Sequence, residues 1–584
     1  MEYEIDILNS YIRDILINAV DKYPLFFSYF TALSRYILVF IALLIAIRTT
    51  RSLFKKSEPE TWGYLDLPNG LHIPINHWEN VIGRARKSDI VLNFNTVSRT
   101  HAALIRKEDG LWEIIDLNSK TGVMVNGEKV EGKSTVDYGD SISFGGIETR
   151  LSALSSVERT IEEIRTPPGV DIKPSFTIYL ITIFQILLCL QLCFANPSRF
   201  DVSLPVCFIL TSTAMWAYFI IFRIMKNRGF EVESIAFFLS SVGLGVTAAS
   251  EPFEMYKHFL AFLIGLLFFI MLGWLIRDVK RANSMRWFMG AAAIGLLMST
   301  AVLGTVVNGA KNWLYIAGFS IQPSEIAKVC FVFAGTATLD RLFAKRNLIM
   351  YLLLTAVCGG LLAFSGDFGA ALIFFVVFLV VSFMRTGDIA TLALITFATA
   401  FGGMITLKFK PYIMNRFSVW GKAWQFPHDG GFQQARTMSA AASGGLFGVG
   451  AGNGWLNRVV AADTDLVFGV VSEELGLLIG LVCIYLILML AVFAAKSTMT
   501  GRSTFYSIMA VAATSMLVFQ MMLNVLGSVD ILPLTGVTFP FVSNGGSSMV
   551  SCFGMMAFVK AADTRRNASF AIKNESIFFR SKIE

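Results

Sequence analysis

The chain has 584 residues, of which 54% are hydrophobic and only 16% are charged, and its mean hydropathy is +0.61. This composition excludes an ordinary soluble globular protein and is typical of a membrane protein. The net charge of +7 does not indicate nucleic-acid binding, because the basic residues stand in short clusters at the ends of apolar runs. We therefore expect membrane lipid, and no nucleic acid, around most of the chain.

Residues 1–56 are predicted to form an N-terminal interfacial segment and the first transmembrane helix. Apolar residues at helical spacing begin at Leu8, and a long apolar run covers about residues 25–47. Basic residues follow this run directly, so the positive-inside rule predicts that its end is cytoplasmic. Arg35 interrupts the run, and its charge should face a neighbouring helix or reach the membrane surface.

Residues 57–155 have a different pattern. Short alternating runs of β-branched residues are separated by turn signals such as Asn126-Gly127. This pattern predicts a small all-β domain, which the preceding basic cluster places on the cytoplasmic side. Residues 156–175 contain Pro167-Pro168-Gly169 and are predicted to form a linker.

Further apolar runs follow the linker, so the chain is predicted to contain about thirteen transmembrane helices. The runs lie at about residues 176–194, 205–222, 231–250, 256–276, 286–306, 322–340, 347–364, 367–384, 388–407, 465–495, 505–527 and 543–560. If the helices alternate in direction, the basic clusters between them are all cytoplasmic. The loops at about 307–321, 408–464 and 528–542 then lie outside. The 408–464 loop is long for a membrane connection, which indicates a functional loop.

The β domain carries three motifs in order: one around Arg84, one at Ser98-Arg99, and one that includes Thr121. In order and spacing they strongly resemble the forkhead-associated (FHA) domain family. The resemblance implies that Arg84 and Ser98 contact a phosphothreonine and that His101 is structural. The chemistry agrees, because a phosphate needs the guanidinium and hydroxyl donors that Arg84, Ser98 and Arg99 supply. Thr121 stands where the family usually has a peptide-holding asparagine. The alternative is an FHA fold used only for protein contact.

Six short motifs follow in order along the membrane-spanning part. They are Gln322-Pro323-Ser324-Glu325, Gly366-Asp367, Gly431-Phe432-Gln433-Gln434, Thr464-Asp465, Ser472-Glu473-Glu474 and Pro540-Phe541-Val542-Ser543-Asn544-Gly545-Gly546-Ser547. Together they resemble the SEDS family of cell-wall proteins, which includes FtsW, RodA and SpoVE. The resemblance implies a ten-helix core, which we place at 231–563, after two extra helices in 176–230 and before a cytoplasmic tail, 564–584. The predicted fold class is a polytopic α-helical membrane protein with an inserted cytoplasmic all-β FHA sandwich.

The SEDS resemblance implies an enzyme of the bacterial cytoplasmic membrane, a peptidoglycan glycosyltransferase that polymerises lipid II on the outer face. Its usual partner is a class B penicillin-binding protein. The transfer needs a base that takes the proton from the acceptor sugar's hydroxyl. Asp465 matches the family's catalytic aspartate and is the predicted base. Asp463 does not fit the motif and is expected to be a solvated loop carboxylate.

The outer loop also carries basic residues that are predicted to bind the lipid pyrophosphate directly or through a divalent cation. They are Arg416, Lys422, Arg436 and Arg458. The alternative is a solvated basic loop that meets anionic lipid headgroups. No histidine and cysteine cluster indicates a metal site, so any cation would be magnesium or manganese on oxygen ligands.

The remaining motif residues are predicted to support the site. They are Gln322, Pro323, Ser324, Glu325, Lys328, Asp367, Glu473, Glu474, Ser543, Gly545, Gly546 and Ser547. Glu325 and Lys328 have the spacing of an intrahelical ion pair, which would only anchor the helix. Asp367 and the two glutamates are costly in a membrane and therefore either functional or paired, Glu474 with an arginine of another helix. Gly545-Gly546 is better explained by close packing or a turn than by a phosphate loop.

Two alternatives to the polymerase remain open. A transporter that flips lipid II would also need a large bundle with intramembrane charges, but it would not need Asp465 as a base. An inactive membrane scaffold would use the FHA domain to recruit a phosphothreonine-containing cell-division protein. In the polymerase interpretation, the same domain would regulate or recruit the enzyme.

Overall fold

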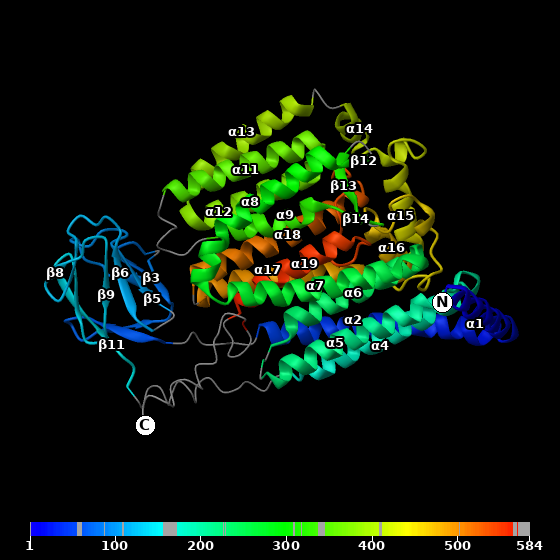
Figure 1. Cartoon of the computed structure of the whole chain (residues 1–584), viewed down its shortest axis with the longest axis horizontal. Helices are drawn as coiled ribbons and strands as arrows, with labels where there is room; N and C mark the ends of the chain where they lie inside the picture. Colours follow the sequence, from blue (N-terminus) through cyan, green and yellow to red (C-terminus); the bar gives the residue numbers. More distant parts are fainter. Residues whose placement is uncertain are drawn as a thin grey trace.

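The structure, a computed structural model, describes residues 2–54, 61–86, 88–107, 110–155, 172–225, 227, 229–307, 310–316, 318–336, 345–407, 411–501, 503–563 and 569. Most of the predicted linker (156–171) and all of the predicted tail except Ser569 lie outside these residues. The described chain consists of a β-sandwich and a long helical bundle (Figure 1). We call the end of the bundle beside the sandwich the sandwich end, and the opposite one the far end.

The sandwich is built from short strands. They are β1 (Gly63–Asp66), β2 (His72–Ile75), β3 (Glu79–Gly83), β4 (Ile90–Val91), β5 (Ala102–Arg106), β6 (Trp112–Asp116), β7 (Val123–Val125), β8 (Glu128–Lys129), β9 (Lys133–Val136), β10 (Ser141–Phe144) and β11 (Ile147–Ser152). One sheet has the order β2-β1-β11-β10-β7-β8, and the other has the order β4-β3-β5-β6-β9. Trp112, Ile114 and Phe144 are completely buried in the core. The predicted turn Asn126-Gly127 joins β7 to β8 with positive φ at both residues, as a two-residue hairpin prefers.

The bundle contains most of the helices. They are α1 (Glu2–Lys22), α2 (Pro24–Leu53), α4 (Pro174–Ala195), α5 (Ser203–Ile224), α6 (Glu231–Ser250), α7 (Met255–Ile276), α8 (Val279–Leu303), α9 (Pro323–Gly335), α11 (Lys345–Ser365), α12 (Phe368–Thr386), α13 (Ile389–Leu407), α14 (Pro411–Val419), α15 (Phe432–Gly444), α16 (Val467–Glu474), α17 (Leu477–Thr500), α18 (Thr504–Ser528) and α19 (Gly546–Ala561). Within the described residues, ten helices are long and apolar enough to cross a membrane: α2, α4, α5, α6, α7, α8, α11, α12, α17 and α18. Helices α9, α13 and α19 occupy the other predicted positions, and α9 and α19 have only 13 and 16 residues.

Two features of the structure differ from the prediction. The apolar run 465–495 is not one helix, because α16 ends at Glu474 and α17 begins at Leu477. Gly476 causes the break: its φ is 96°, and a Cβ there would lie 2.4 Å from the carbonyl oxygen of Leu446. The loops are also more ordered than expected. The outer loop folds into α14 and α15, and the segment before α9 forms a three-stranded sheet of β12 (Thr305–Val307), β13 (Ala310–Ile316) and β14 (Phe319–Ile321).

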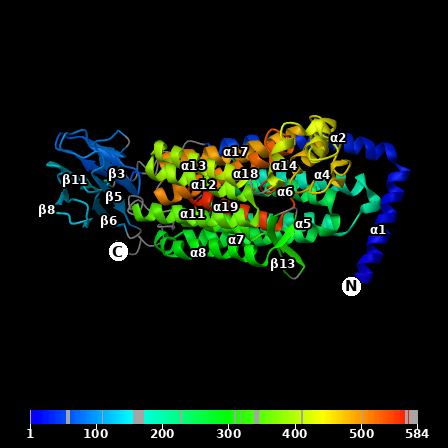
Figure 2. The same cartoon turned by 90° about the horizontal axis from the view of Figure 1, so that it is seen from above.

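Helix α1 crosses the far end of the bundle (Figure 2). It is attached there by Asn9, whose amide donates to the Asp201 carboxylate at 3.0 Å, and by Arg13, which donates to the carbonyl oxygen of Phe200 at 3.1 Å. Tyr11 and Ile15 are among the large apolar side chains that α1 leaves exposed. This arrangement is the one expected of an interfacial helix.

The sandwich contacts the bundle through the start of β3. The buried Glu79 carboxylate accepts hydrogen bonds from the Ser503 hydroxyl at 2.8 Å and from the backbone N–H of Thr504 at 3.2 Å. His77 Nδ1 lies 2.6 Å from the carbonyl oxygen of Gly501. Ser503 and Thr504 form the N-terminus of α18, where free N–H groups and the helix dipole favour a carboxylate. Strands β3 and β5 accordingly lie on the bundle side of the sandwich (Figure 1).

Candidate functional site

Asp465 lies at the far end, on a tight turn just before α16. Its backbone N–H donates to the carbonyl oxygen of Ala461 at 2.9 Å, and Ala461 has a positive φ of 61°. The side chain of Asn524 on α18 holds this turn in place. Its side-chain amide donates to the carbonyl oxygen of Asp465 at 3.0 Å and to that of Val537 at 2.8 Å. Asn524 is only 1% exposed, so its amide serves to hold the two backbone segments together.

Charged groups around Asp465 adjust its acidity. Burial raises the pKa of Asp465 to about 6; the Arg416 guanidinium lowers this pKa, and the negative charges of Asp463 and Asp367 raise it. The Asp465 carboxylate and the Arg416 guanidinium both lie beside Gly536, where an added Cβ would be 3.4 Å from Asp465 Oδ2 and 4.0 Å from Arg416 Nη1. A carboxylate with this pKa is well suited to accept a proton near neutral pH.

Asp463 is not the solvated loop carboxylate that was expected. The Asn544 side chain donates to Asp463 Oδ2 at 2.9 Å, and the backbone N–H of Asn544 donates to the Asp463 carbonyl oxygen at 2.8 Å. Burial raises the pKa of Asp463, while the hydrogen bond from Asn544 lowers it. Ser543 joins the same contact, because its hydroxyl donates to the carbonyl oxygen of Thr464 at 2.6 Å. The start of the last motif therefore supports the Asp465 turn directly.

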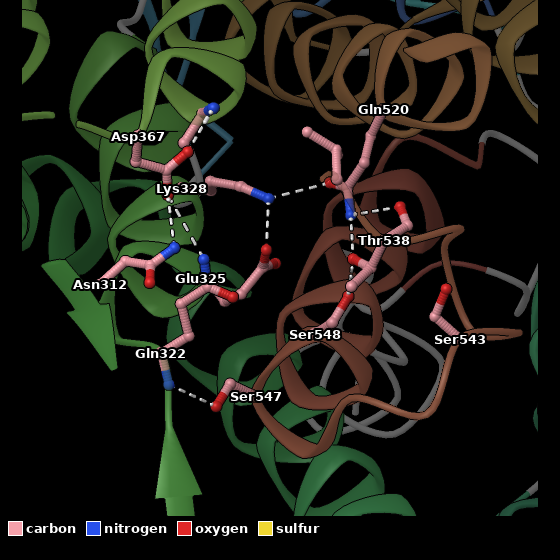
Figure 3. A network of polar contacts seen from close by, with 12 residues as sticks. Asn312, Gln322, Glu325, Lys328, Asp367, Gln520, Thr538, Ser543, Ser547 and Ser548 are labelled. Atoms are coloured by element: carbon pink, nitrogen blue, oxygen red, sulfur yellow. Dashed lines mark hydrogen bonds and ion pairs between the residues drawn. The ribbon is translucent and has the colours of Figure 1, made fainter. Parts of the chain in front are cut away.

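A buried polar network links Glu325 and Lys328 of α9 with Gln520 of α18 (Figure 3). The Lys328 ammonium donates to Glu325 Oε1 at 2.7 Å and to Gln520 Oε1 at 3.0 Å, and both charged residues are at most 3% exposed. The Gln520 amide donates in turn to the Thr538 hydroxyl at 2.9 Å, and Thr538 and Ser548 hydroxyls lie 2.8 Å apart. The predicted intrahelical pair is present, and it also links α9 to α18 and α19.

Asp367 connects this network with β13 and α9. It caps α12 by accepting from the backbone N–H of Ala370 at 3.0 Å, and it accepts from the side chains of Gln322 at 3.4 Å and Asn312 at 3.5 Å. The backbone N–H of Gln322 donates to the Ser547 hydroxyl at 2.9 Å. Within the described residues, the buried Ser324 hydroxyl has no hydrogen-bond partner.

The remaining motif residues form helix ends. Pro323 occupies the first turn of α9, where its missing N–H costs nothing. Gly545 and Gly546 are the N-cap and first residue of α19, in agreement with a turn and not with a phosphate loop. Glu473 and Glu474 end α16. Glu473 accepts from the backbone N–H groups of Trp455 and Leu456, each at 3.0 Å, and Glu474 accepts from that of Gly452 at 2.9 Å. In the described part of the chain, no arginine pairs with Glu474.

The four basic residues of the outer loop are all exposed, but they are not equivalent. Arg416 lies beside Asp465 and donates to the carbonyl oxygen of Leu534 at 2.9 Å. Arg436 packs over the Phe432 ring at 5.3 Å. No contact given by the described residues brings Lys422 or Arg458 to Asp465. A role in pyrophosphate binding stays a prediction for all four, and the geometry favours Arg416.

The residues that are predicted to bind a phosphopeptide lie together at one end of the sandwich. Arg84 Nη1 donates to Asn95 Oδ1 at 3.0 Å, the Ser98 hydroxyl accepts from the Lys120 N–H at 3.1 Å, and the Thr121 hydroxyl donates to the Thr96 carbonyl oxygen at 3.1 Å. Arg99 is exposed beside them. His101 is fully buried and accepts from the Ser98 N–H at 3.1 Å, which fits its predicted structural role.

Sequence patterns could have identified some residues that were missed. Asn524 and Gln520 are polar amides inside a long apolar helix, and such residues commonly make interhelical hydrogen bonds. Asn544 belongs to a motif that was recognised, but its pairing with Asp463 has no signal in the sequence. Among the described residues, no group of three or more histidine, cysteine, aspartate or glutamate side chains could hold a metal ion.

Comparisons with known proteins agree with the motifs. Residues 202–568 match the sequence profile of the FtsW, RodA and SpoVE family, described as cell cycle proteins, and residues 80–145 match that of the FHA domain. The chain is 29% identical over 391 residues to the probable peptidoglycan glycosyltransferase FtsW of Tolumonas auensis, which covers 62% of this chain and 99% of that protein. It is 28% identical over 317 residues to the peptidoglycan glycosyltransferase RodA of Mycobacterium tuberculosis, with 51% of this chain and 67% of RodA covered.

A solved peptidoglycan synthase complex contains a chain that aligns with 56% of this protein and 96% of its own length, at 24% identity and a TM-score of 0.47. The first profile match covers more than half of the sequence, and it includes most of the membrane-capable helices. The chain is a multi-pass membrane protein that belongs to the FtsW, RodA and SpoVE family of cell cycle proteins and carries an FHA domain.

Proposed function

We propose that this protein is a peptidoglycan glycosyltransferase that polymerises lipid II, with Asp465 as its general base. The observation that carries the proposal is the Asp465 carboxylate itself. The backbone of Asp465 is fixed by Asn524 and by the turn at Ala461, the pKa of its carboxylate is raised to about 6 mainly by burial, and Arg416 lies next to it. The names of the FtsW and RodA relatives support the same activity.

In the proposed step, the 4-hydroxyl of the acceptor sugar attacks the anomeric carbon of the donor. A new C–O bond forms there, while the bond from that carbon to the pyrophosphate oxygen breaks. The hydroxyl proton passes to the Asp465 carboxylate, and undecaprenyl pyrophosphate leaves with the bonding electron pair. The positive charge of Arg416 stabilises the negative charge that develops on the leaving group.

A divalent cation is not built into this proposal. Among the described residues, no group of three or more histidine, cysteine, aspartate or glutamate side chains could form a resident magnesium or manganese site. Magnesium in phosphate chemistry is commonly held by one or two carboxylates together with the substrate's own oxygens. We therefore derive no step through a cation.

We also propose the sidedness and the partners. The β-sandwich lies at one end of the bundle, and α15 and α16, which flank the Asp465 turn, lie at the other, which supports a cytoplasmic FHA domain and an extracytoplasmic active site (Figure 1). The SEDS resemblance supports a class B penicillin-binding protein as the partner that would crosslink the strands. The FHA domain would bind a phosphothreonine-containing protein at Arg84 and Ser98. This binding would recruit or regulate the enzyme.

The decisive test is strand synthesis from purified lipid II by the full chain, with its penicillin-binding partner present if needed. Asp465→Asn should lower the rate at least about a hundredfold, the range of a lost general base. Asp429→Asn is the matched control, because Asp429 is an exposed carboxylate of the same outer loop. It should polymerise at the normal rate.

Other results would favour the alternatives. If Asp465→Asn made normal strands, the proposed role of Asp465 as general base would be wrong. If the wild type made no strands, lipid II movement across proteoliposomes would test a transporter. If neither the wild type nor the variant made strands or moved lipid II, the scaffold would remain. Phosphothreonine peptide binding by the full chain that did not depend on Arg84 would contradict the proposed FHA site.

A further inference from the structure

Two helices that precede the family-matching segment, α2 and α4, contact the loop that leads to the active site. The family profile begins at residue 202, whereas α2 and α4 cover residues 24–53 and 174–195. The loop is the glycine-rich segment 445–454 between α15 and α16. Gly448, Gly450 and Gly452 all have positive φ, between 78° and 102°, so this segment has a backbone shape that few other residues would adopt.

Gln191 of α4 makes the central contact. Its side-chain oxygen accepts from the backbone N–H of Ala451 at 3.1 Å, and its side-chain nitrogen donates to the hydroxyl of Ser34 on α2. Gln191 is 1% exposed and Ser34 is 2% exposed, so both polar groups are removed from lipid and water. A buried glutamine is costly unless its amide is used, and here the amide joins α2, α4 and the loop.

Arg35 of α2 holds the same loop at a second point. Its guanidinium donates to the carbonyl oxygen of Gly448 at 3.2 Å and lies 5.0 Å from the Tyr36 ring. The Tyr36 ring packs in turn on Phe447, with ring centroids 4.8 Å apart. These contacts account for a charge inside an apolar run that the sequence left unexplained. Arg35 therefore faces the loop.

The packing is close enough to fix the position of the loop. A Cβ on Gly450 would lie 2.7 Å from Thr31 Cγ2 of α2, and a Cβ on Gly452 would lie 3.0 Å from Ala195 Cβ of α4. Real Cβ contacts are rarely this short. The loop backbone therefore rests directly on both helices, and neither helix is merely a neighbour in the lipid.

The loop is in turn hydrogen-bonded to α16, the helix that follows the Asp465 turn. Gly452 donates to the Glu474 carboxylate, and the backbone N–H groups of Trp455 and Leu456 donate to the Glu473 carboxylate. Both glutamates belong to α16, and the chain between Leu456 and α16 contains the Asp465 turn. A shift of the loop must therefore move α16 or the turn.

We propose that α2 and α4 are part of the catalytic unit, and that Gln191 and Arg35 are positioning residues that act on Asp465 through the loop 445–454. The proposal rests on the proposed glycosyl transfer. It gives the two helices outside the family profile a specific task, which is to hold the base in place for the chemical step.

The test uses the full chain in the lipid II assay, with Gln191→Leu and Arg35→Leu as separate variants. Each loses one hydrogen bond to the loop, so kcat should fall about tenfold while KM changes little. Ser34→Ala is the control, because it removes the bond between α2 and α4 but leaves the Ala451 contact. Arg35→Lys should recover most of the rate, since an ammonium also donates to a carbonyl.

A second readout separates positioning from folding. If the turn loosens, water reaches Asp465, its pKa falls, and the acid limb of the kcat profile moves to lower pH. Arg416, Asp463 and Asp367, the charged groups nearest Asp465, are unchanged in these variants. A variant that only reduced the amount of folded protein would lower the rate with the same pH profile, and that result would overturn the proposal. So would wild-type kcat in Gln191→Leu and Arg35→Leu. If the wild type itself made no strands, the proposed function would fail instead.

Discussion

The FHA sandwich and the Asp465 site hold their functional residues in opposite ways. In the sandwich, Arg84 and Ser98 stand on exposed loops, and the strand ladder beneath them sets their positions. In the bundle, the amide of Asn524 on α18 holds the Asp465 backbone, and the charges of Arg416, Asp463 and Asp367 act on its carboxylate. Local register is enough for a binding surface, whereas a buried carboxylate depends on long-range side-chain contacts. A single substitution should therefore lower the free energy of unfolding more in the bundle than in the sandwich.

The largest effect is expected at the buried ion pair. Lys328→Met leaves the Glu325 carboxylate buried without its cation, so the free energy of unfolding should fall by about 3–5 kcal/mol. Thermal unfolding of the purified protein in detergent measures this loss. The double variant Glu325→Gln with Lys328→Met should recover part of it, because no uncompensated charge remains. Equal stability of Lys328→Met and the wild type would contradict the comparison.

The sandwich should lose binding instead of stability. Arg84→Ala removes a charged hydrogen-bond donor from an exposed loop, so phosphothreonine peptide affinity should fall roughly ten- to a hundredfold with little change in unfolding. Arg86→Ala, on the same loop, is the matched control and should bind normally. Isothermal titration of the full chain gives both constants, and equal losses in the two variants would argue against a specific phosphate contact.

The pH dependence of catalysis should follow the protonation of the Asp465 carboxylate. Protonated Asp465 cannot accept a proton, so the rate should fall about tenfold per pH unit below about 6. Asp463→Asn removes a negative charge that raises the pKa of Asp465, so the acid limb should move to lower pH. Arg416→Gln removes a positive charge that lowers this pKa, so the limb should move to higher pH. Shifts of the same sign in both variants would rule out this electrostatic arrangement.

The smallest effect is expected where the two regions meet. Glu79→Ala removes the carboxylate that caps α18, which is worth about 1 kcal/mol. The amides of Thr504 and Phe505 should then exchange with deuterium roughly five times faster. Glu113→Ala is the control, because Glu113 pairs with lysines within the sandwich. Unchanged exchange in Glu79→Ala would show that the contact does not hold the helix end.

The sequence predicted what local patterns encode. Asn126-Gly127 indicated its hairpin because only a few residues accept that turn, and apolar runs indicated the helices because length and hydropathy are local. The break at Gly476 was missed, because a single glycine within a helical pattern does not by itself end a helix and no proline marks the position. The partner of Asp463, the loop contact of Gln191 and the docking of Glu79 were also missed. Each depends on residues far apart in sequence, and a single polar residue carries no periodic signal.

The contact at Glu79 determines where the FHA domain lies relative to the bundle. The sandwich is covalently joined to α2 on one side and to α4 on the other, so its docking on α18 is intramolecular and does not need a high affinity. Strand β3 has Glu79 at one end and Gly83, next to Arg84, at the other. A phosphoprotein bound at Arg84 would thus lie at the end of β3 opposite Glu79. Once bound, its place beside the bundle would be set by the docking of the sandwich on α18.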